Sequence, residues 1–365
     1  MTKYVVRRLF LGLLTVLAVA LLMFIFEQIV PDKPYSYLLR TIRSSSAQDY
    51  TNQINALKAR FGYDQPFYMQ FLFYLRNLLH PVYSWFYTDD SVRQNLCAGL
   101  GDTCNVTNGF HLRAPLGPDF GYSQILHQDV WQAITDRVGA TAELMGSAYL
   151  VTLVIAVPLG IVSAVRQHSR LDNTLTSASF IGISLPNYWF GTILVYLFAI
   201  LPYQHGLPKI FPASGQNTTG LEGSLPDLAW HLVLPVTVLA VQQIAGYQRY
   251  IRASMLEVLS QDYIRTARAK GLADRRVVLR HALRNSLLPF ITLMGLDIPQ
   301  LFVGAVITEF VFSWPGMGQL FVNSAGTSDF PILTGIALVL SAFVVVGNLT
   351  ADLAYSWADP RIAYD

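Results

Sequence analysis

The residues best suited to chemistry in this sequence form a basic segment over 249–289. Nine Lys or Arg side chains and three acidic ones lie between Arg249 and Asn285. Small residues, Ala267 and Gly271, stand among the cations. Clustered cations with small residues at a turn suit binding to anionic head groups or insertion into a groove of another protein. The sequence therefore predicts a binding segment here and no catalytic centre.

Apolar residues in this segment recur at near-helical spacing, at Leu256, Leu259, Tyr263, Ile264 and Ala267. Gly271 is predicted to end a helix, because glycine readily takes the left-handed conformation that follows a helix. Arg268 and Lys270 fall in the last turn, where cations suit the helix dipole. A second helix is expected to begin at Ala273 or Asp274 and to run into the next apolar stretch.

Two interpretations of this segment remain open from the residues alone. The positive charge is explained by anchoring to anionic lipid on the cytoplasmic side. Lipid anchoring does not explain Gln261-Asp262-Tyr263, the Thr266-Ala267 pair or the glycine stop. These features suit docking of a helix–turn–helix into a partner protein, so lipid anchoring and docking both stay open.

Catalytic motifs are missing from the sequence. The dipeptide Gly-Lys never occurs, so there is no G-x-x-x-x-G-K-[ST] loop to hold a nucleotide phosphate. H-E-x-x-H and G-x-S-x-G are absent as well. The seven histidines lack the spacing of metal ligands, at positions 80, 111, 127, 168, 205, 231 and 281. The sequence predicts neither an enzyme nor a metal site.

The composition is that of a membrane protein. Apolar residues make up 53% of the chain and charged residues 13%, about half the ~25% charged residues of a soluble domain. A membrane-spanning helix needs about 20 mostly apolar residues. Six stretches qualify, at 9–30, 141–165, 174–201, 228–247, 286–312 and 331–355. We expect an all-α polytopic protein with about six transmembrane helices, kinked where Pro186, Pro235 and Pro299 interrupt them.

The distribution of Lys and Arg predicts the orientation. If the N-terminus is cytoplasmic, the cytoplasmic segments carry fifteen Lys or Arg, and the short outer loops carry one, Lys209. Cytoplasmic loops are enriched in these residues, so both termini are predicted to be cytoplasmic. The predicted organisation is the N-terminal end and first span (1–30), an extracytoplasmic region (31–140), a transmembrane core (141–355) with a cytoplasmic loop (249–285), and a cytoplasmic tail (356–365).

Two cysteines fall in the predicted outer region. Cys97 and Cys104 have six residues between them, and a disulfide persists outside the cytoplasm. The pair is interpreted as a small structural staple, with two free thiols as the alternative.

Three polar residues lie inside predicted spans. Asp297 is in the fifth, and Gln242 and Gln243 are in the fourth. Polar side chains are costly in a membrane and face a cavity or a partner. These residues are candidates for the translocation path, with bonding between spans as the alternative.

Several motifs together resemble a known family. The stretch Asp262–Leu272, DYIRTARAKGL, is followed by RHALRN at 280–285 and Leu288-Pro289. It resembles the coupling loop of ABC importer permeases, in particular the first permease of the dipeptide/oligopeptide/nickel branch. The resemblance is close over 117–365 and weak over 1–75, and it includes GAVITE at 304–309, FSWPGMG at 312–318 and DPRI at 359–362.

The resemblance implies a type I ABC importer permease fold and a subunit that is not itself catalytic. Its implied partners are two ABC ATPase subunits, a homologous second permease, an extracytoplasmic substrate-binding protein and membrane lipid, with no nucleic acid. No cofactor is expected in this chain; the ATPase subunits would bind ATP and Mg. The implied location is a bacterial or archaeal cytoplasmic (inner) membrane. The implied ATPase-coupling residues are Asp262, Tyr263, Arg265, Thr266, Ala267, Arg268, Ala269, Lys270 and Gly271.

The sequence also departs from the wider importer pattern. The wider pattern has Glu-Ala-Ala at the position where this sequence has Arg265-Thr266-Ala267. The Arg-Thr-Ala form is typical of the peptide branch. Residues 80–115 resemble an insertion, and Asp32-Lys33-Pro34 replaces the usual Gly-Asp-Pro. The expected function is import of di- or oligopeptides. The alternatives are nickel chelates or another small solute in the same family, or a secondary transporter that works alone.

Overall fold

The computed structural model describes residues 2–29, 51, 55, 65–79, 120, 122–123 and 125–358. Some helical side chains in these ranges, among them those of 295–304 and 351–358, are outside the description. Three predictions fall on residues outside it: the pairing of Cys97 with Cys104, the 80–115 insertion and the structure of the tail after residue 358.

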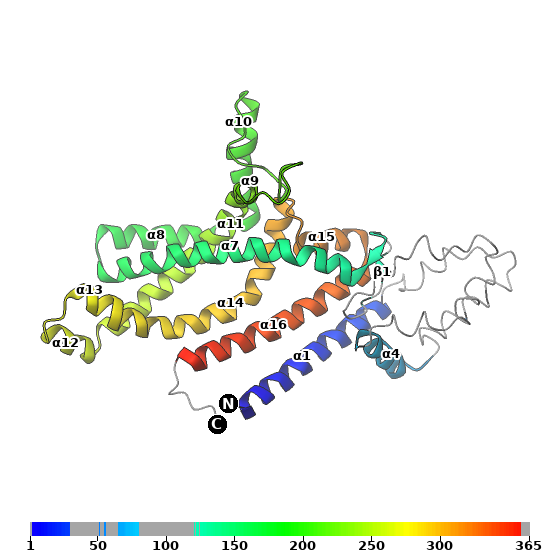
Figure 1. Ribbon diagram of the computed structural model, residues 1–365, viewed down its shortest axis with the longest axis horizontal. Helices are drawn as coiled ribbons and strands as arrows, with labels where there is room; N and C mark the ends of the chain where they lie inside the picture. Colours follow the sequence, from blue (N-terminus) through cyan, green and yellow to red (C-terminus); the bar gives the residue numbers. More distant parts are fainter. Residues whose placement is uncertain are drawn as a thin grey trace. The chain divides into compact units, whose positions relative to one another are not determined.

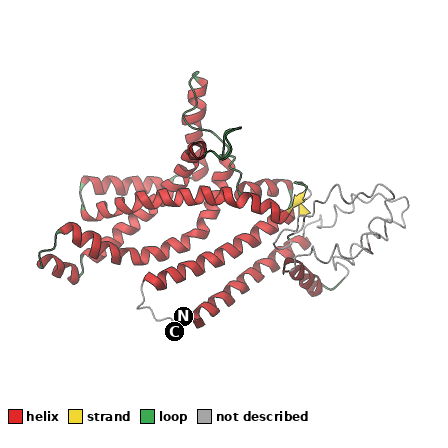
Figure 2. Ribbon diagram, in the orientation of Figure 1, coloured by secondary structure: helices red, strands yellow, loops and turns green. Residues whose placement is uncertain are grey.

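Helices account for most of the described residues (Figures 1 and 2). The longest are α1 (Thr2–Ile29), α7 (Val130–Val165), α11 (Leu225–Leu259), α14 (Leu283–Val311) and α16 (Phe330–Ala358). The shorter ones are α4 (Phe67–Leu79), α8 (Arg170–Ser184), α9 (Asn187–Val195), α10 (Leu201–Gln204), α12 (Asp262–Ala269), α13 (Asp274–Arg276) and α15 (Met317–Thr327). Two π-helical turns, η2 (Tyr196–Ile200) and η3 (Val277–Ala282), continue α9 and α13.

The helices match the predicted spans. In the described part, α1, α7, α11 and α16 are each long and apolar enough to cross a membrane, and α8 with α9–α10 forms a fifth, bent candidate. The fifth predicted span is occupied by α14, whose 29 residues extend about 44 Å at 1.5 Å per residue. The all-α polytopic fold is therefore confirmed.

The third predicted span is broken, which corrects the expectation of one kinked helix over 174–201. Its two halves, α8 and α9–α10, meet at 98°, and Figure 1 shows α9 and α10 turning away from α8. Leu185 has ψ 120° and Pro186 has ψ 129°, both extended. Proline disfavours a helical conformation at the residue before it, so α8 ends at Ser184 and α9 begins after Pro186.

The chain divides into two compact units, and the larger contains the basic segment. It comprises Met1–Leu13, Arg137–Asn323 and Ala342–Asp365. Its main core joins α7, α11, α12, η3 and α14 through ten buried side chains. They are Ala156, Ala164, Tyr247, Ile251, Met255, Ile264, Ala267, Val277, Ala282 and Phe290.

The smaller unit comprises Leu14–Asp136 and Ser324–Ser341. Three aromatic rings from 67–74 pack around Phe24 of α1 with centroid distances of 5.2–5.5 Å. Strands β1 (Tyr122–Ser123) and β2 (Gln128–Asp129) form an antiparallel hairpin before α7. Ser123 donates a hydrogen bond to Asp329. Burial raises the pKa of Asp329, and the Ser123 bond opposes part of that effect.

The loop between α10 and α11 folds back onto the larger unit. Gly215 N donates to Phe312 O at 2.9 Å, and Gln216 Nε2 donates to Glu143 Oε2 at 2.6 Å. Gly206 begins the loop with φ +74°. Further along, the Gly220 N–H donates to Glu222 and lowers the pKa of that carboxyl.

Candidate functional site

The basic segment begins in the last turns of α11, which ends at Leu259. Ser260 N donates to Glu257 O and Gln261 N to Val258 O, which closes the last turn. Gln261 is extended, with ψ 149°, and α12 begins after it. The apolar spacing from Leu256 to Ala267 had predicted one continuous helix. That prediction is wrong, because the chain turns at residues 260–261.

Helix α12 is amphipathic, with one side in the core and the other in solvent. Ile264 is 0% exposed and Ala267 is 9% exposed. Charged side chains cover the outer side, and Arg265 and Asp262 are 74% and 97% exposed with 3.6 Å between them. A surface ion pair of this kind contributes about 0–1 kcal/mol. The core therefore holds α12 in place, and its charged face is open to a partner.

Gly271 ends α12 in the predicted way. Its φ is +75°, Gly271 N donates to Arg268 O at 2.9 Å, and Leu272 N donates to Ala267 O at 3.4 Å. These two bonds form a Schellman motif, in which the glycine takes the left-handed position. No described atom beyond the immediate neighbours lies within 4 Å of a Cβ added at Gly271. The turn requires glycine for its backbone conformation, and the space around it is open.

The second arm of the segment returns the chain to the hydrophobic core of the larger unit. Ala273 precedes α13, which begins at Asp274 as predicted, and η3 buries Val277 and Ala282. Arg268 Nε lies 3.4 Å from Asp274 Oδ1 across the turn. Exposed cations follow on this arm, at Arg275, Arg276, Arg280 and Arg284.

One bond that the sequence did not predict joins the two arms. Asn285 Nδ2 donates to Tyr263 OH at 2.9 Å. Tyr263 is 44% exposed, so it lies off the buried face to which the spacing had assigned it. A single sequence carries no signal for a contact between residues 22 positions apart in two different helices.

The core contact of α12 makes a stability prediction. Replacing Ile264 with Ala is expected to lower the free energy of unfolding by about 2–5 kcal/mol, because the side chain is fully buried. The matched change Arg265→Ala on the exposed face is expected to stay within about 0.5 kcal/mol. Thermal or denaturant unfolding of the purified chain in detergent measures both. Equal effects at the two positions would contradict the burial of this face.

The predicted path residues are not brought together into a described site. Gln242 is exposed on α11, and Gln243 Oε1 accepts a hydrogen bond from Thr152 Oγ1 of α7 at 3.3 Å. Asp297 lies within α14, and the structure does not describe its side chain. The bond of Gln243 fits the alternative of a contact between spans, and the path assignment stays a prediction.

A second built feature surrounds Glu309, which is fully buried. Its carboxyl oxygens accept bonds from Thr141 Oγ1 at 2.7 Å, Gly318 N at 2.7 Å and Gln319 N at 3.1 Å. The latter two amides belong to the first turn of α15, where a negative group suits the helix dipole. A Cβ at Gly318 would lie 2.5 Å from Val306 Cα. The motif at 312–318 is therefore a tightly packed turn that holds α15 against α14 and α7.

Within the part of the chain that the structure describes, no cluster of three or more His, Cys, Asp or Glu could hold a metal ion. The described features are long apolar helices and an exposed, basic helix–turn–helix between two of them. They define a multi-pass membrane protein with a basic helix–turn–helix between two of its long helices.

Residues 156–364 match the family described as binding-protein-dependent transport system inner membrane component. This match covers more than half of the chain, and the chain belongs to that family. The family predicted from the coupling-loop motif is confirmed.

Similarity to individual relatives extends over the whole chain. The oligopeptide transport system permease protein AppB of Bacillus subtilis (strain 168) is 35% identical over 365 residues, covering 100% of both chains. The dipeptide transport system permease protein DppB of Escherichia coli (strain K12) is 30% identical, covering 100% of this chain and 99% of that one. An inward-facing structure of the MetNI methionine ABC transporter has a TM-score of 0.50 at 16% identity, covering 62% of this chain and 97% of that one. The likeness in structure agrees with a type I ABC importer permease fold.

Proposed function

We propose that this chain is a transmembrane permease subunit of an ATP-driven ABC importer and forms part of the path for di- or oligopeptides. The observation that carries the proposal is α12, a helix whose apolar face packs in the hydrophobic core of the larger unit and whose charged face is exposed. Similarity along the full chain to permeases named for oligopeptides and dipeptides supports the peptide assignment.

The partners follow from this role. Two ABC ATPase subunits would bind ATP and Mg and receive α12 with its glycine turn; this chain supplies no catalytic group. A homologous second permease would complete the path, and an extracytoplasmic binding protein would deliver the peptide. Apolar side chains exposed along the spans, such as Leu150 and Val154, would face lipid or the second permease. Of the nine residues named for coupling, Ala267 packs in the core, and the other eight remain the proposed contact with the ATPases.

Coupling works through the shared core. Closure of the ATPase pair would displace α12, and Ile264 and Ala267 would carry that displacement to α11, η3 and α14, because all four elements pack in one cluster. The path would then switch between inward-facing and outward-facing states. ATP can bias this equilibrium only by its difference in affinity for the two states. A shift from 1:99 to 99:1 requires about 5.5 kcal/mol.

The orientation is part of the proposal. The loop 249–285, which contains α12 to η3, would lie in the cytoplasm together with both termini. The chain would cross the cytoplasmic membrane of a bacterium or archaeon. The fifteen-to-one distribution of Lys and Arg supports this placement. The region 31–140 would lie outside, the core 141–355 would span the membrane, and Asp297, Gln242 and Gln243 would line the path.

Uptake in cells tests the cargo. Deleting the gene in its host is expected to abolish ATP-dependent uptake of labelled di- to oligopeptides, and the intact gene is expected to restore it. Nickel uptake measured in the same strains is expected to be unchanged. Loss of nickel uptake with normal peptide uptake would keep the importer and overturn the peptide assignment.

A further inference from the structure

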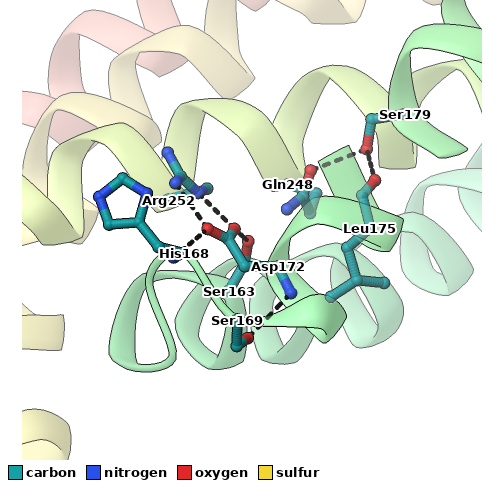
Figure 3. Close-up of polar contacts among 8 residues, drawn as sticks. All are labelled: Ser163, His168, Ser169, Asp172, Leu175, Ser179, Gln248 and Arg252. Atoms are coloured by element: carbon teal, nitrogen blue, oxygen red, sulfur yellow. Dashed lines mark hydrogen bonds and ion pairs between the residues drawn. The ribbon is translucent and has the colours of Figure 1, made fainter. Parts of the chain in front are cut away.

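One buried carboxyl ties three helices together near the start of α8 (Figure 3). Asp172 has a side chain only 2% exposed, against 24% for Arg252. Arg252 of α11 donates to it twice, from Nε to Oδ1 at 2.7 Å and from Nη2 to Oδ2 at 2.8 Å. Ser163 of α7 donates to the same carboxyl, and so does His168 N of the α7–α8 turn, at 2.9 Å. The group therefore fixes the α7–α8 turn to α11.

This pair ends a longer seam along which α8 and α11 run antiparallel. Farther along both helices, Ser179 Oγ donates a hydrogen bond to Gln248 Oε1 at 2.7 Å. Beyond that bond the two helices approach closely, since a Cβ added at Gly182 would lie 3.2 Å from Ala245 Cβ. The Ser179–Gln248 and Gly182–Ala245 contacts share one antiparallel register, and the Asp172–Arg252 pair extends the contact to the start of α8.

The buried polar groups between α8 and α11 are not equally hydrogen-bonded. Asp172 is bonded through both carboxyl oxygens. Gln248 Nε2 is buried and has no hydrogen-bond partner among the described residues. The Asp172–Arg252 pair is therefore the stronger of the two polar contacts between α8 and α11. Its two Arg–carboxyl bonds are geometrically specific, whereas the unpaired buried amide of Gln248 weakens the other contact.

The same part of α11 contacts the coupling helix. Ile251 and Met255, which flank Arg252, pack in the cluster that holds Ile264 and Ala267 of α12. Ser254 Oγ also donates to Ser286 O of α14 at 3.0 Å. Leu259, the last residue of α11, lies seven positions after Arg252, or about 10 Å along the helix. A movement of α12 therefore reaches α11 at the place where Asp172 is attached.

We propose that Asp172 and Arg252 are positioning residues that transmit movement of α12 from α11 to the broken span α8–α9. The proposal rests on the proposed function. A buried ion pair is a poor device for stability alone, since apolar replacements are often as stable. Its value here is that it fixes one register of α8 on α11, so the two helices move as one body.

The test measures coupling and uses three variants. The complete complex is reconstituted in liposomes, and the ratio of peptide transported to ATP hydrolysed is determined. Arg252→Gln removes the guanidinium that donates twice to Asp172. The double variant, Asp172→Asn with Arg252→Gln, removes both charges and so leaves no unpaired charge buried. Arg170→Gln is the control, because Arg170 lies on α8, as Asp172 does, but its side chain is exposed.

Both Arg252→Gln and the double variant are expected to lower the ratio about tenfold, within the ~5–150-fold range of couplings between sites. The control is expected to keep the wild-type ratio. A purely structural role would reduce the amount of assembled complex and lower both activities together, leaving the ratio unchanged. An unchanged ratio in either variant, or failure of both to assemble, overturns the proposal.

The wild-type complex separates this inference from the proposed function. If wild-type liposomes show no ATP-driven peptide transport, the proposed function fails and the inference falls with it. If the wild type couples normally and both variants do too, the inference alone is wrong.

Discussion

Replacing Gly271 with Arg is expected to leave the chain in the membrane and to abolish its association with ATPase subunits. The left-handed backbone at Gly271 costs a non-glycine residue about 1–2 kcal/mol, which the core of α12 can tolerate. The added side chain meets open space within the chain, so it would project toward a docked partner. Transport is expected to fall about a hundredfold, the effect of losing roughly 2.7 kcal/mol at an interface hot spot.

Two controls isolate docking from backbone strain. Gly206 has φ +74° and equally open space in the described structure, so Gly206→Arg carries the same strain in the α10–α11 loop. It is expected to retain the ATPase subunits. Gly271→Asn is also expected to retain them, because asparagine tolerates this conformation better than arginine. Normal transport by Gly271→Arg would rule out docking through this turn.

Replacing Glu309 with Ala is expected to lower the free energy of unfolding by about 3 kcal/mol. The change removes the acceptor of two buried hydrogen bonds and one part-buried one, and each buried donor left unpaired costs about 1–3 kcal/mol. The unfolding midpoint of the purified chain in detergent, with the yield of folded protein, measures the loss.

Glu309→Gln is the matched change. Its amide oxygen can accept from the Gly318 and Gln319 N–H groups, and its Nε2 can donate to Thr141 Oγ1. The expected loss is therefore about 1 kcal/mol or less. Glu257→Ala, at an exposed position on α11, is expected to change stability by less than about 0.5 kcal/mol. If the Ala and Gln variants at 309 unfold alike, Glu309 does not act as the acceptor for α15.

The sequence predicted features that depend on local pattern. Apolar length predicted the spans, since each must bury about 20 residues in lipid. Gly271 predicted the end of α12, because the left-handed conformation there selects glycine. The break at Pro186 was predicted only as a kink, because a proline marks the position of a helix interruption and leaves its angle to packing.

Other features depend on contacts between distant residues and left no pattern to detect. Asp172 and Arg252 are 80 positions apart, and Thr141 and Glu309 are 168 apart. The turn at Ser260 was missed because apolar residues on both sides continue the helical spacing. Of the site, the sequence supplied the basic helix–turn–helix. The structure added the core that holds it and the polar fastening of α11.

Affinity purification of this chain from its host, with the co-purifying proteins identified by mass spectrometry, tests the central claim most directly. The account predicts a second permease of the same family, ATPase subunits with nucleotide-binding motifs and an extracytoplasmic binding protein that carries peptide. Gly271→Arg purified in parallel should lose the ATPases and keep the second permease. A chain that purifies alone or as a homo-oligomer and transports solute in liposomes without any ATPase would contradict the account.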